Sequence, residues 1–391
     1  MKRMVTATLA VALASASGLV GLGATSTASA SSKPIIIGEI MGTTGAYGST
    51  GVAAFNSSKM AVDKINAAGG VLGRQIKILY GNDGASATTA ALLFKKFVSE
   101  GAVAILGSGD TAPTTVSLAD SMKIPSVGLI DDGGAAIYPN GPNKAPYPWA
   151  WSTSLNGYAV GQALGSYAMA HCPGGLYVLH DSTPYGIGGL TGIQISYTKA
   201  LKGNDSISEN WSSSSPAAAT MDSELAKAKA SGADCVEAWL TPQDLATFVN
   251  EMHSQGDNFT VLGNDETNSD ATFSNLVGPN ANGVVSAALK NIVTPTTADK
   301  AYNAAYLKKF KIQPTVWGQV MYDGVFILAK AINAAKSTAP AKIKDQLNNI
   351  HNYVGLTGIL TFTKMQHTTI NGPQFTAVQY SSSTSKWSAI K

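Results

Sequence analysis

The feature that most constrains the fold is the stretch of residues 34–83, which joins two short apolar runs through a glycine-rich loop and a helical segment. The apolar runs cover residues 35–40 and 76–80, and apolar side chains recur at helical spacing between them. A strand, a helix and a second strand in this order form a βαβ unit, which implies a parallel sheet. Ligands of such sheets bind at the carboxyl ends of the strands, so the loop at residues 41–51 is the first candidate binding wall.

The same alternation of apolar runs and helical segments continues along the chain, and it restarts after a Pro/Gly/Asn-rich excursion at residues 139–148. The predicted strands are residues 35–40, 76–80, 102–106 and 124–130 before the excursion, and 176–180, 236–240, 261–263, 283–289 and 375–380 after it. Helices are also predicted at residues 299–310, 317–335 and 342–350. By itself, this periodicity predicts two successive α/β halves and a helical tail.

The amino-acid composition limits which classes of protein this chain can belong to. Hydrophobic residues make up 45% of the 391 residues and charged residues only 13%, which allows large cores and argues against disorder. The formal net charge is +3, and Lys2 and Arg3 supply two of those charges. Because the remainder is close to neutral and no basic run stands out, we expect no nucleic-acid partner.

Residues 1–30 have the features of a secretory signal peptide. A positive start at Lys2-Arg3 precedes a mildly apolar stretch at residues 5–23 and an A-x-A cleavage site at residues 28–30. The alternative, a transmembrane anchor, is disfavoured because the stretch is rich in Ala, Ser, Gly and Thr and poor in Leu and Ile. With no cysteine near the cleavage site, we expect a periplasmic or secreted protein without a lipid anchor.

The chain contains two cysteines, Cys172 and Cys235, and each lies just before a predicted strand. If those strands are neighbours, both sulfurs lie at the same edge of the sheet. An exported protein permits a disulfide between them, and the two Cα atoms should then lie within roughly 7 Å. The alternative is two separate buried thiols.

The glycine-rich loop and the sequence INAAGGVLGRQIKILYGND at residues 65–83 resemble the type I periplasmic solute-binding proteins, in the branched-chain amino acid and amide branch that serves ABC transporters. The resemblance runs from about Lys33 nearly to the C-terminus, and Tyr322-Asp323-Gly324 resembles the family's YDA helix. It implies two doubly wound parallel-sheet lobes joined by a three-crossing hinge. The expected lobes are residues 31–153 with 286–357, and residues 154–285 with 358–391.

On the first lobe, the resemblance implies a ligand-facing aromatic at Tyr47 and a ligand loop at Ser108, Gly109 and Asp110; a plain turn is the alternative for this loop. Residues 107–112 also match G-x-G-x-x-A, and Asp131 follows at about the spacing of a dinucleotide fingerprint. A lone match of this kind is weak evidence, and this one lies in the third βα unit rather than the first. Because the chain is also expected to be exported, a nicotinamide cofactor is disfavoured.

On the second lobe, Tyr185 matches the tyrosine of the family's D-x-x-x-Y-G motif, which faces the ligand. For Tyr185, as for Tyr47, the alternative is packing within the loop. Asp265 lies where the family carries the acid that binds the ligand's amino group, and the alternative for it is a helix N-cap. Trp239 and Trp317 fall near two further aromatic positions, one on each lobe, with core packing as the alternative.

The sequence departs from the family at Asp110, Asp131 and Asp132, where amino-acid binders show Ser, Ala or Thr. Several carboxylates around one cleft would repel a ligand carboxylate. This favours an amine, a polyol or a neutral amide as the ligand, unless some of these aspartates only cap helices.

No sequence pattern favours catalysis. The five histidines lack metal-ligand spacing, and there is no H-E-x-x-H, P-loop or G-x-S-x-G motif, so we expect no cofactor and no metal. The resulting prediction is a monomeric solute-binding protein of an ABC importer, with a small-molecule ligand and a membrane permease as partners. A ligand-sensing subunit for a signalling receptor is the main alternative, and a secreted hydrolase is the third.

Overall fold

The computed structural model describes residues 33–44, 48–109, 111–128, 136–141, 144–182, 184–207, 218–269, 271–368 and 374–390. The chain divides into two units, Met1–Ser32 and Lys33–Lys391, and every described residue belongs to the second. The predicted leader at residues 1–30 lies outside the described residues. So do four predicted site residues, Tyr47, Asp110, Asp131 and Asp132.

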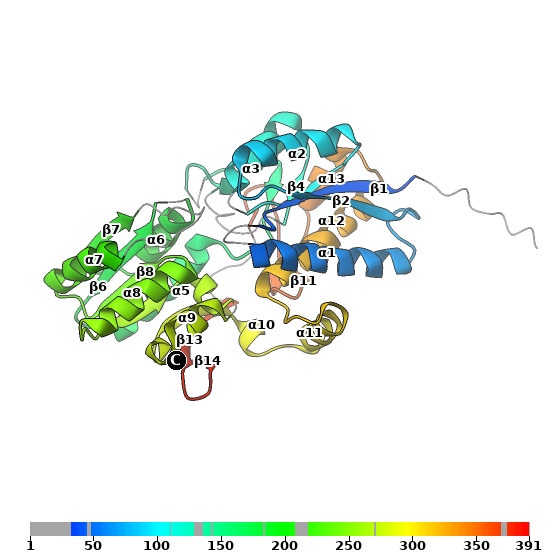
Figure 1. The fold of residues 1–391 in the computed structure, drawn as a ribbon. Helices are drawn as coiled ribbons and strands as arrows, with labels where there is room; N and C mark the ends of the chain where they lie inside the picture. The colour runs from blue at the N-terminus through cyan, green and yellow to red at the C-terminus, as the bar shows by residue number, and fades with distance from the viewer. Residues whose placement is uncertain are drawn as a thin grey trace, which may run out of the picture. The chain divides into compact units, whose positions relative to one another are not determined.

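The first sheet has five strands in the order β2-β1-β3-β4-β5, and every pairing in it is parallel. Its strands and their helices are β1 (Ile35–Met41), α1 (Gly48–Ala67), β2 (Ile76–Asn82), α2 (Ala87–Ser99), β3 (Ile105–Gly107), α3 (Ala112–Met122), β4 (Ser126–Val127) and β5 (Ala150–Trp151). Helix α1 lies on one face of this sheet, and α2 and α3 lie on the other (Figure 1). Their apolar side chains pack against the strands on these two faces.

The second sheet has seven strands in the order β14-β13-β10-β9-β8-β6-β7. Its elements are α5 (Gly157–His171), β6 (Leu176–Asp181), α6 (Pro184–Ser196), β7 (Gly203–Ile207), α7 (Ala218–Ser231), β8 (Cys235–Trp239), α8 (Pro242–Ser254), β9 (Thr260–Gly263), η1 (Asp265–Asn268), α9 (Thr272–Val277), η2 (Gly278–Ala281), β10 (Val285–Leu289), β13 (Phe375–Ser381) and β14 (Lys386–Ala389). Helices α5 and α6 cover one face, and α7 and α8 cover the other.

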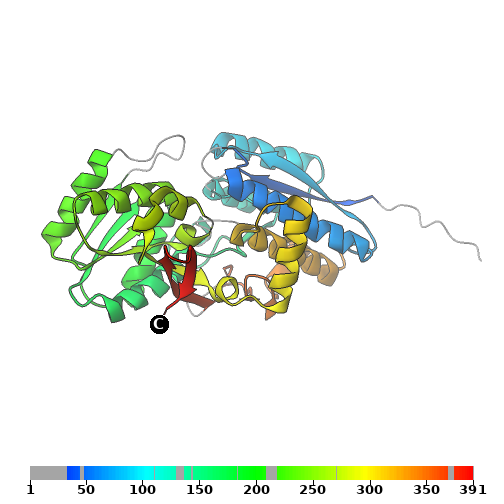
Figure 2. The same cartoon turned by 60° about the horizontal axis from the view of Figure 1, so that its bottom comes forward.

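Between β10 and β13 the chain leaves the second sheet and packs on the first. This segment contains α10 (Lys290–Val293), α11 (Thr297–Phe310), α12 (Val316–Ala335), α13 (Pro340–Leu347), β11 (Tyr353–Val354) and β12 (Ile359–Leu360). Helix α12 shares a core with α1, and α11 lies beside α1 (Figure 2). The segment thus belongs with the first sheet, although β10 before it and β13 after it belong to the second.

Local sequence signals fix where several helices begin. The side chain of Asn156 accepts a hydrogen bond from the N–H of Ala159 at the start of α5, and Thr315 caps α12 in the same way. At α11, Thr296 and Asp299 form a reciprocal capping box. Such caps satisfy N–H groups that have no partner within the helix, which explains why these helices begin where they do.

The second sheet differs from the all-parallel prediction, because β13 pairs antiparallel with β10 and with β14. Strands β7 and β14 were not expected at all. Both are edge strands whose side chains are mostly exposed or half-buried, so their sequences lack the apolar runs that mark a buried strand.

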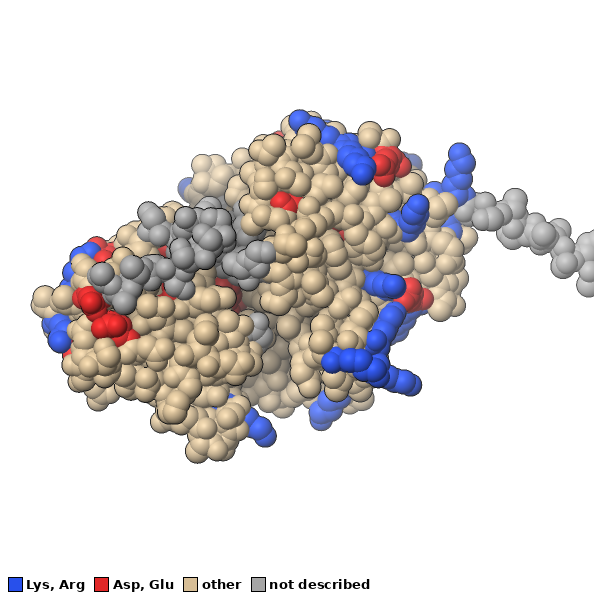
Figure 3. All heavy atoms as spheres, in the orientation of Figure 1, with Lys and Arg blue, Asp and Glu red and all other residues tan. Residues whose placement is uncertain are grey.

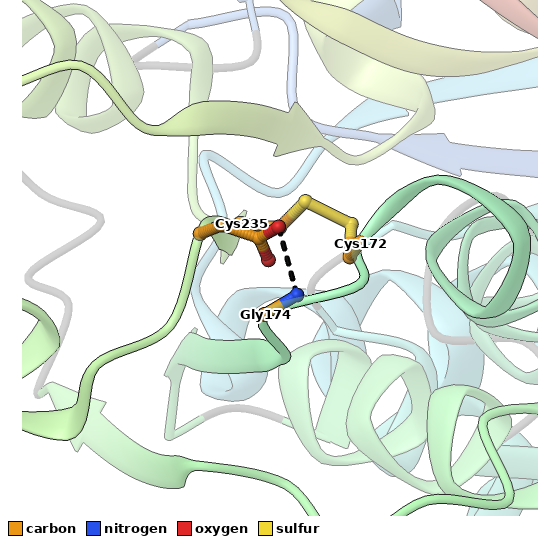
Figure 4. Close-up of a disulfide and its surroundings, with 4 residues drawn as sticks. Cys172, Gly174 and Cys235 are labelled. Carbon is orange, nitrogen blue, oxygen red and sulfur yellow. Dashed lines mark hydrogen bonds between the residues drawn. A yellow bond between two sulfur atoms is a disulfide. The ribbon is translucent and has the colours of Figure 1, made fainter.

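The predicted disulfide is present and joins Cys172 to Cys235, with the two Cα atoms 5.8 Å apart (Figure 4). Cys172 follows α5, and Cys235 opens β8 opposite Leu176 of β6. Beside the bridge, the N–H of Gly174 donates a hydrogen bond to Asp234 Oδ2 at 2.9 Å. The neighbouring starts of β6 and β8 therefore bring the two cysteines together, as the sequence implied.

Within the described residues, no helix combines enough length with enough apolar character to cross a membrane. The lobe boundaries remain a prediction.

Candidate functional site

Three predicted site residues of the second sheet lie together at the carboxyl ends of its strands. Trp239 is the last residue of β8, opposite His180 of β6, and Asp265 follows β9 by two residues. Tyr185 lies in the first turn of α6, directly after β6. Because β6, β8 and β9 are parallel neighbours, the segments that follow them emerge at one edge of the sheet.

These three side chains touch one another. The hydroxyl of Tyr185 donates a hydrogen bond to Asp265 Oδ1. The rings of Tyr185 and Trp239 meet edge to face, with centroids 5.1 Å apart. All three side chains are buried, and Trp239 is completely so. The arrangement is therefore a small aromatic and acidic cluster rather than three separate surface positions.

Trp239 also acts as the support for α6. A Cβ atom at Gly189 would lie 2.3 Å from the indole ring, so glycine lets the helix backbone lie directly on the ring. Since Tyr185 is in the first turn of this helix, the contact also fixes where the phenol ring lies. Trp239 is thus a core residue, which was the alternative for it, and it contacts a candidate site residue.

One carboxylate oxygen of Asp265 can accept a further hydrogen bond. The N-cap of η1 is Asn264, whose side chain accepts from the N–H of Glu266, so Asp265 does not have the capping role that was its alternative. Its second oxygen, Oδ2, is buried and has no hydrogen-bond partner among the described residues. Burial raises the pKa of Asp265 to about 6, although the hydrogen bond from Tyr185 works in the other direction. At neutral pH the group is mainly ionised and can accept a donor.

Asp265 lines a cavity of about 110 Å³ between the second sheet and the helices that pack on the first. On the second-sheet side the lining includes Asp265, Asn268 and residues 287–289. On the other side it includes Asn303 of α11 and Gln319 of α12. A volume of this size holds only a few non-hydrogen atoms, such as the polar end of a small ligand or several water molecules.

The two amide side chains on the helix side also have unused acceptors. Gln319 Oε1 and Asn303 Oδ1 are buried and have no hydrogen-bond partner within the described part of the chain. Buried polar atoms are normally paired, so these three oxygens can accept hydrogen bonds from a ligand or from ordered water in the cavity. Since an amide can present either its oxygen or its NH₂ group, the cavity can bind donors through Asp265 and either donors or acceptors through the amides.

Sequence reasoning missed this helix side of the cavity. Gln319 lies two residues after Trp317, on a helix whose other early residues are buried, and a polar side chain in such a position was the available signal. Asn268 anchors η1 by donating to Ser286 Oγ at 2.6 Å and to the carbonyl of Ala287 at 2.7 Å. That contact bridges two segments and has no signature in the sequence.

Among the first-lobe predictions, Ser108 and Gly109 follow β3 as expected, and both are buried. The Ser108 hydroxyl receives a hydrogen bond from Thr115 at 2.9 Å and lies 3.1 Å from the Thr111 hydroxyl, which in turn donates to Asp83 at 2.6 Å. These bonds direct the Ser108 side chain into the lobe. The loop can therefore present its backbone to a ligand more readily than its serine hydroxyl.

Trp317 lies in the first turn of α12, and its side chain packs in the core with 4% of its surface exposed. It is not among the residues that line the cavity with Asp265. The structure thus brings Tyr185, Trp239 and Asp265 together and places Trp317 in the helix turn next to Gln319. Tyr47, Asp110, Asp131 and Asp132 lie outside the described residues.

A buried histidine connects two of the segments that run between the sheets. The ring of His367 stacks on Trp151 with centroids 4.7 Å apart, and its Nδ1 lies 2.8 Å from the carbonyl oxygen of Ala150. The N–H of Ser152 donates to the carbonyl of His367 at 2.9 Å. Burial lowers the pKa of His367 to about 4, so the ring is neutral at ordinary pH.

Comparison with known proteins adds to this geometry. A sequence model of the periplasmic binding protein family matches residues 34–384. The chain is 24% identical over 353 residues to Leu/Ile/Val-binding protein homolog 2 of Brucella abortus (strain 2308). The aligned region covers 88% of this chain and 89% of the relative.

Two solved structures show the same fold. A periplasmic binding protein type 1 from Bordetella pertussis Tohama I superposes with a TM-score of 0.81 at 21% identity, over 91% of this chain and 99% of that one. The solute-binding protein of an ABC transporter from R. palustris, in complex with benzoate, has a TM-score of 0.74 at 18% identity, over 91% and 95% of the two chains. These relatives and fold neighbours are binding proteins and not enzymes. The chain belongs to the periplasmic binding protein family.

Proposed function

We propose that this protein is the solute-binding component of an ABC importer, which captures a small polar ligand between its two lobes and delivers it to a membrane permease. The observation that carries the proposal is the cavity between the second sheet and the helices that pack on the first. There the buried Asp265 Oδ2 has no hydrogen-bond partner among the described residues. A ligand that fills this space contacts both sides, so its binding favours a closed arrangement over an open one.

The polar groups at the cavity favour a ligand with a hydrogen-bond donor. Asp265 accepts, and the Tyr185 hydroxyl already satisfies its other oxygen. An ammonium group, an amide NH₂ or a polyol hydroxyl would each supply the missing donor. The relatives differ in this respect, because one is named for leucine, isoleucine and valine and another holds benzoate. The proposed class is therefore an amino acid, amine, amide or polyol, with its donor at Asp265.

The proposed site is larger than the cavity. Tyr185, Trp239 and Asp265 form the wall on the second lobe, and Tyr185 supplies an aromatic face for the body of the ligand. For the opposite wall we propose the residues expected from the sequence, which are the loop at residues 108–110, Tyr47, Asp131, Asp132 and Trp317. Gln319 and Asn303 extend this wall at the polar end.

Closure would bend the chain at the segments that connect the lobes, near residues 151–155, 286–290 and 355–361. Specific contacts tie two of these segments to neighbouring parts of the chain. At the first segment, the ring of His367 contacts the carbonyl oxygen of Ala150, and Ser152 forms a β-bridge with Thr368. At the last segment, Asp323 accepts hydrogen bonds from the N–H groups of Leu356 and Thr357, at 3.0 and 2.8 Å.

Two experiments test this function. Native mass spectrometry of the purified protein should reveal a co-purified small ligand, which identifies its class. Calorimetry with that ligand should then show that Tyr185→Ala lowers the binding free energy by about 2 kcal/mol or more, because a large contact surface is lost at a closed interface. Asp265→Asn should cost about as much for a cationic ligand and much less for a neutral one.

The matched control is Asp257→Asn, which changes an acid that pairs with Lys229 at 2.8 Å, outside the cavity lining. It should leave affinity unchanged. Wild-type affinity in the Tyr185→Ala protein would show that the ligand binds elsewhere. Ligand turnover would replace the importer proposal with an enzyme, and ligand-dependent binding to a signalling receptor in place of a permease would replace it with a sensor.

A further inference from the structure

A second hollow adjoins the cavity at Asp265, since Asn291 lines both, and it is lined by α1, α11, α12 and the β11–β12 hairpin. Its volume is about 1040 Å³, and its lining includes the aromatic side chains of Tyr302, Tyr322, Phe326 and Tyr353. The rings of Tyr302 and Tyr322 meet edge to face, and the ring centroids of Tyr322 and Phe326 lie 4.9 Å apart. We call this hollow the aromatic groove.

The hairpin beside the aromatic groove exposes two aliphatic side chains. Val354 and Ile359 are paired across β11 and β12, and they are 77% and 55% exposed. Leu307 and Ile312, at the end of α11, are also exposed. Single exposed aliphatic residues are ordinary, but a groove with aromatic walls next to an exposed aliphatic pair is a mark of a binding surface.

Lysines border the aromatic groove and the helices around it. The lysine rim consists of six exposed residues on or directly after α1 and α11: Lys59, Lys64, Lys300, Lys308, Lys309 and Lys311. Figure 3 shows lysine side chains gathered over α11, with an acidic side chain beside them. Asp63 is the exposed acid of these two helices among the described residues, and it pairs with Lys309 at 2.6 Å.

This basic character is local. On the second sheet, lysines are interspersed with acids: Lys227 pairs with Asp205 and Glu224, and Lys229 pairs with Asp257. In the described part of the chain, no salt bridge involves Lys59, Lys300, Lys308 or Lys311. A cluster of exposed lysines without nearby acids makes a local positive potential, which attracts an anionic partner.

We propose that the lysine rim and the β11–β12 hairpin together form a surface that binds an anionic lipid membrane. The charges attract the lipid headgroups, and Val354 and Ile359 can enter the boundary between headgroups and acyl chains. An acidic soluble partner would use the lysines but would not require the exposed aliphatic pair, and a neutral apolar partner would not require the lysines. Both features together fit a surface that is negatively charged outside and apolar beneath.

The proposal is independent of which ligand the cleft binds. Each lysine near an anionic surface contributes about a fivefold gain in partitioning at moderate ionic strength, and the gain is screened by salt. Several lysines acting together would hold the protein at the membrane without a covalent anchor. Closeness to the bilayer would raise the rate of encounter with any membrane-embedded partner.

Vesicle co-sedimentation of the purified protein tests the proposal. Vesicles of phosphatidylcholine should bind little protein, and vesicles with about one third phosphatidylglycerol should bind at least tenfold more, with the difference lost at high salt. Lys300→Glu with Lys308→Glu should abolish the gain. Val354→Ser with Ile359→Ser should reduce binding severalfold at constant salt.

The matched control is Lys95→Glu with Lys96→Glu on α2, which covers the opposite face of the first sheet and changes the net charge equally. It should retain at least most of the binding. Equal loss in this control would show a general charge effect and overturn the proposal, as would equal binding to both vesicle types. Retained binding in the Val354 and Ile359 variant, together with displacement by an acidic polypeptide, would assign the surface to an acidic protein instead. Circular dichroism of each variant verifies that it is folded.

Discussion

Replacing Asp265 by asparagine should stabilise the ligand-free protein at neutral pH, although the same change should weaken the binding of a cationic ligand. The reason is that the wild-type protein holds an ionised carboxylate in a buried place, with one oxygen unpaired. Asparagine has nearly the same shape, and its oxygen can still accept the hydrogen bond from Tyr185. The variant therefore removes the charge and keeps the packing.

The magnitude follows from the pKa. Burial raises the pKa of Asp265 from 3.8 to about 6, so the ionised form is disfavoured in the folded state. The wild-type protein should lose about 3 kcal/mol of stability from this group as the pH rises from the ordinary pKa of aspartate through 6. The asparagine variant has no such loss. Its advantage should be close to zero at about pH 4 and reach about 1 to 3 kcal/mol above pH 6, because the new NH₂ group needs partners of its own.

Chemical denaturation of both ligand-free proteins between about pH 4 and pH 8 measures this difference. Asp257→Asn is the control, because that carboxylate pairs with Lys229 outside the cavity and its loss should bring no such gain. An asparagine variant that is less stable than wild type at pH 7, or a stability difference that does not change across the pH range, would refute the reasoning. Either result would mean that Asp265 is already well solvated or paired in the free protein.

Three further predictions concern the rest of the molecule. The double variant Cys172→Ala with Cys235→Ala should be about 4 kcal/mol less stable in denaturant, since the bridge closes a loop with a sequence separation of 63, and a loss below about 1 kcal/mol would contradict this. Because burial lowers the pKa of His367 to about 4, its contribution to stability should be complete above its ordinary pKa of 6.5 and lost as the pH falls towards 4; His367→Gln should flatten the denaturation profile in that window, and an unchanged profile would count against it. Finally, small-angle scattering should show a smaller radius of gyration with bound ligand, and an identical curve would argue against hinge closure.

The sequence by itself determined the local structure and the family. Apolar runs that alternate with helical segments predicted the strands of both sheets that are buried on two faces, because such strands need apolar side chains throughout. The positions of Cys172 and Cys235, each before such a run, predicted the disulfide. Motifs around Tyr185 and at residues 65–83 indicated the family, since a tyrosine or a glycine in a fixed loop position leaves a pattern in the sequence.

Only the tertiary structure decided which side chains meet. Tyr185 and Asp265 are 80 positions apart, and their hydrogen bond depends on the order of β6, β8 and β9 in the sheet. Asn303 and Gln319 lie on helices that return to the first sheet, so no local pattern links them to Asp265. The periodicity of apolar residues indicates which face of a helix or strand is buried. It does not indicate which other element packs against that face. For the same reason the sequence did not indicate that the Ser108 hydroxyl would be bonded inside its lobe, or that an aromatic groove would form between α11 and the β11–β12 hairpin.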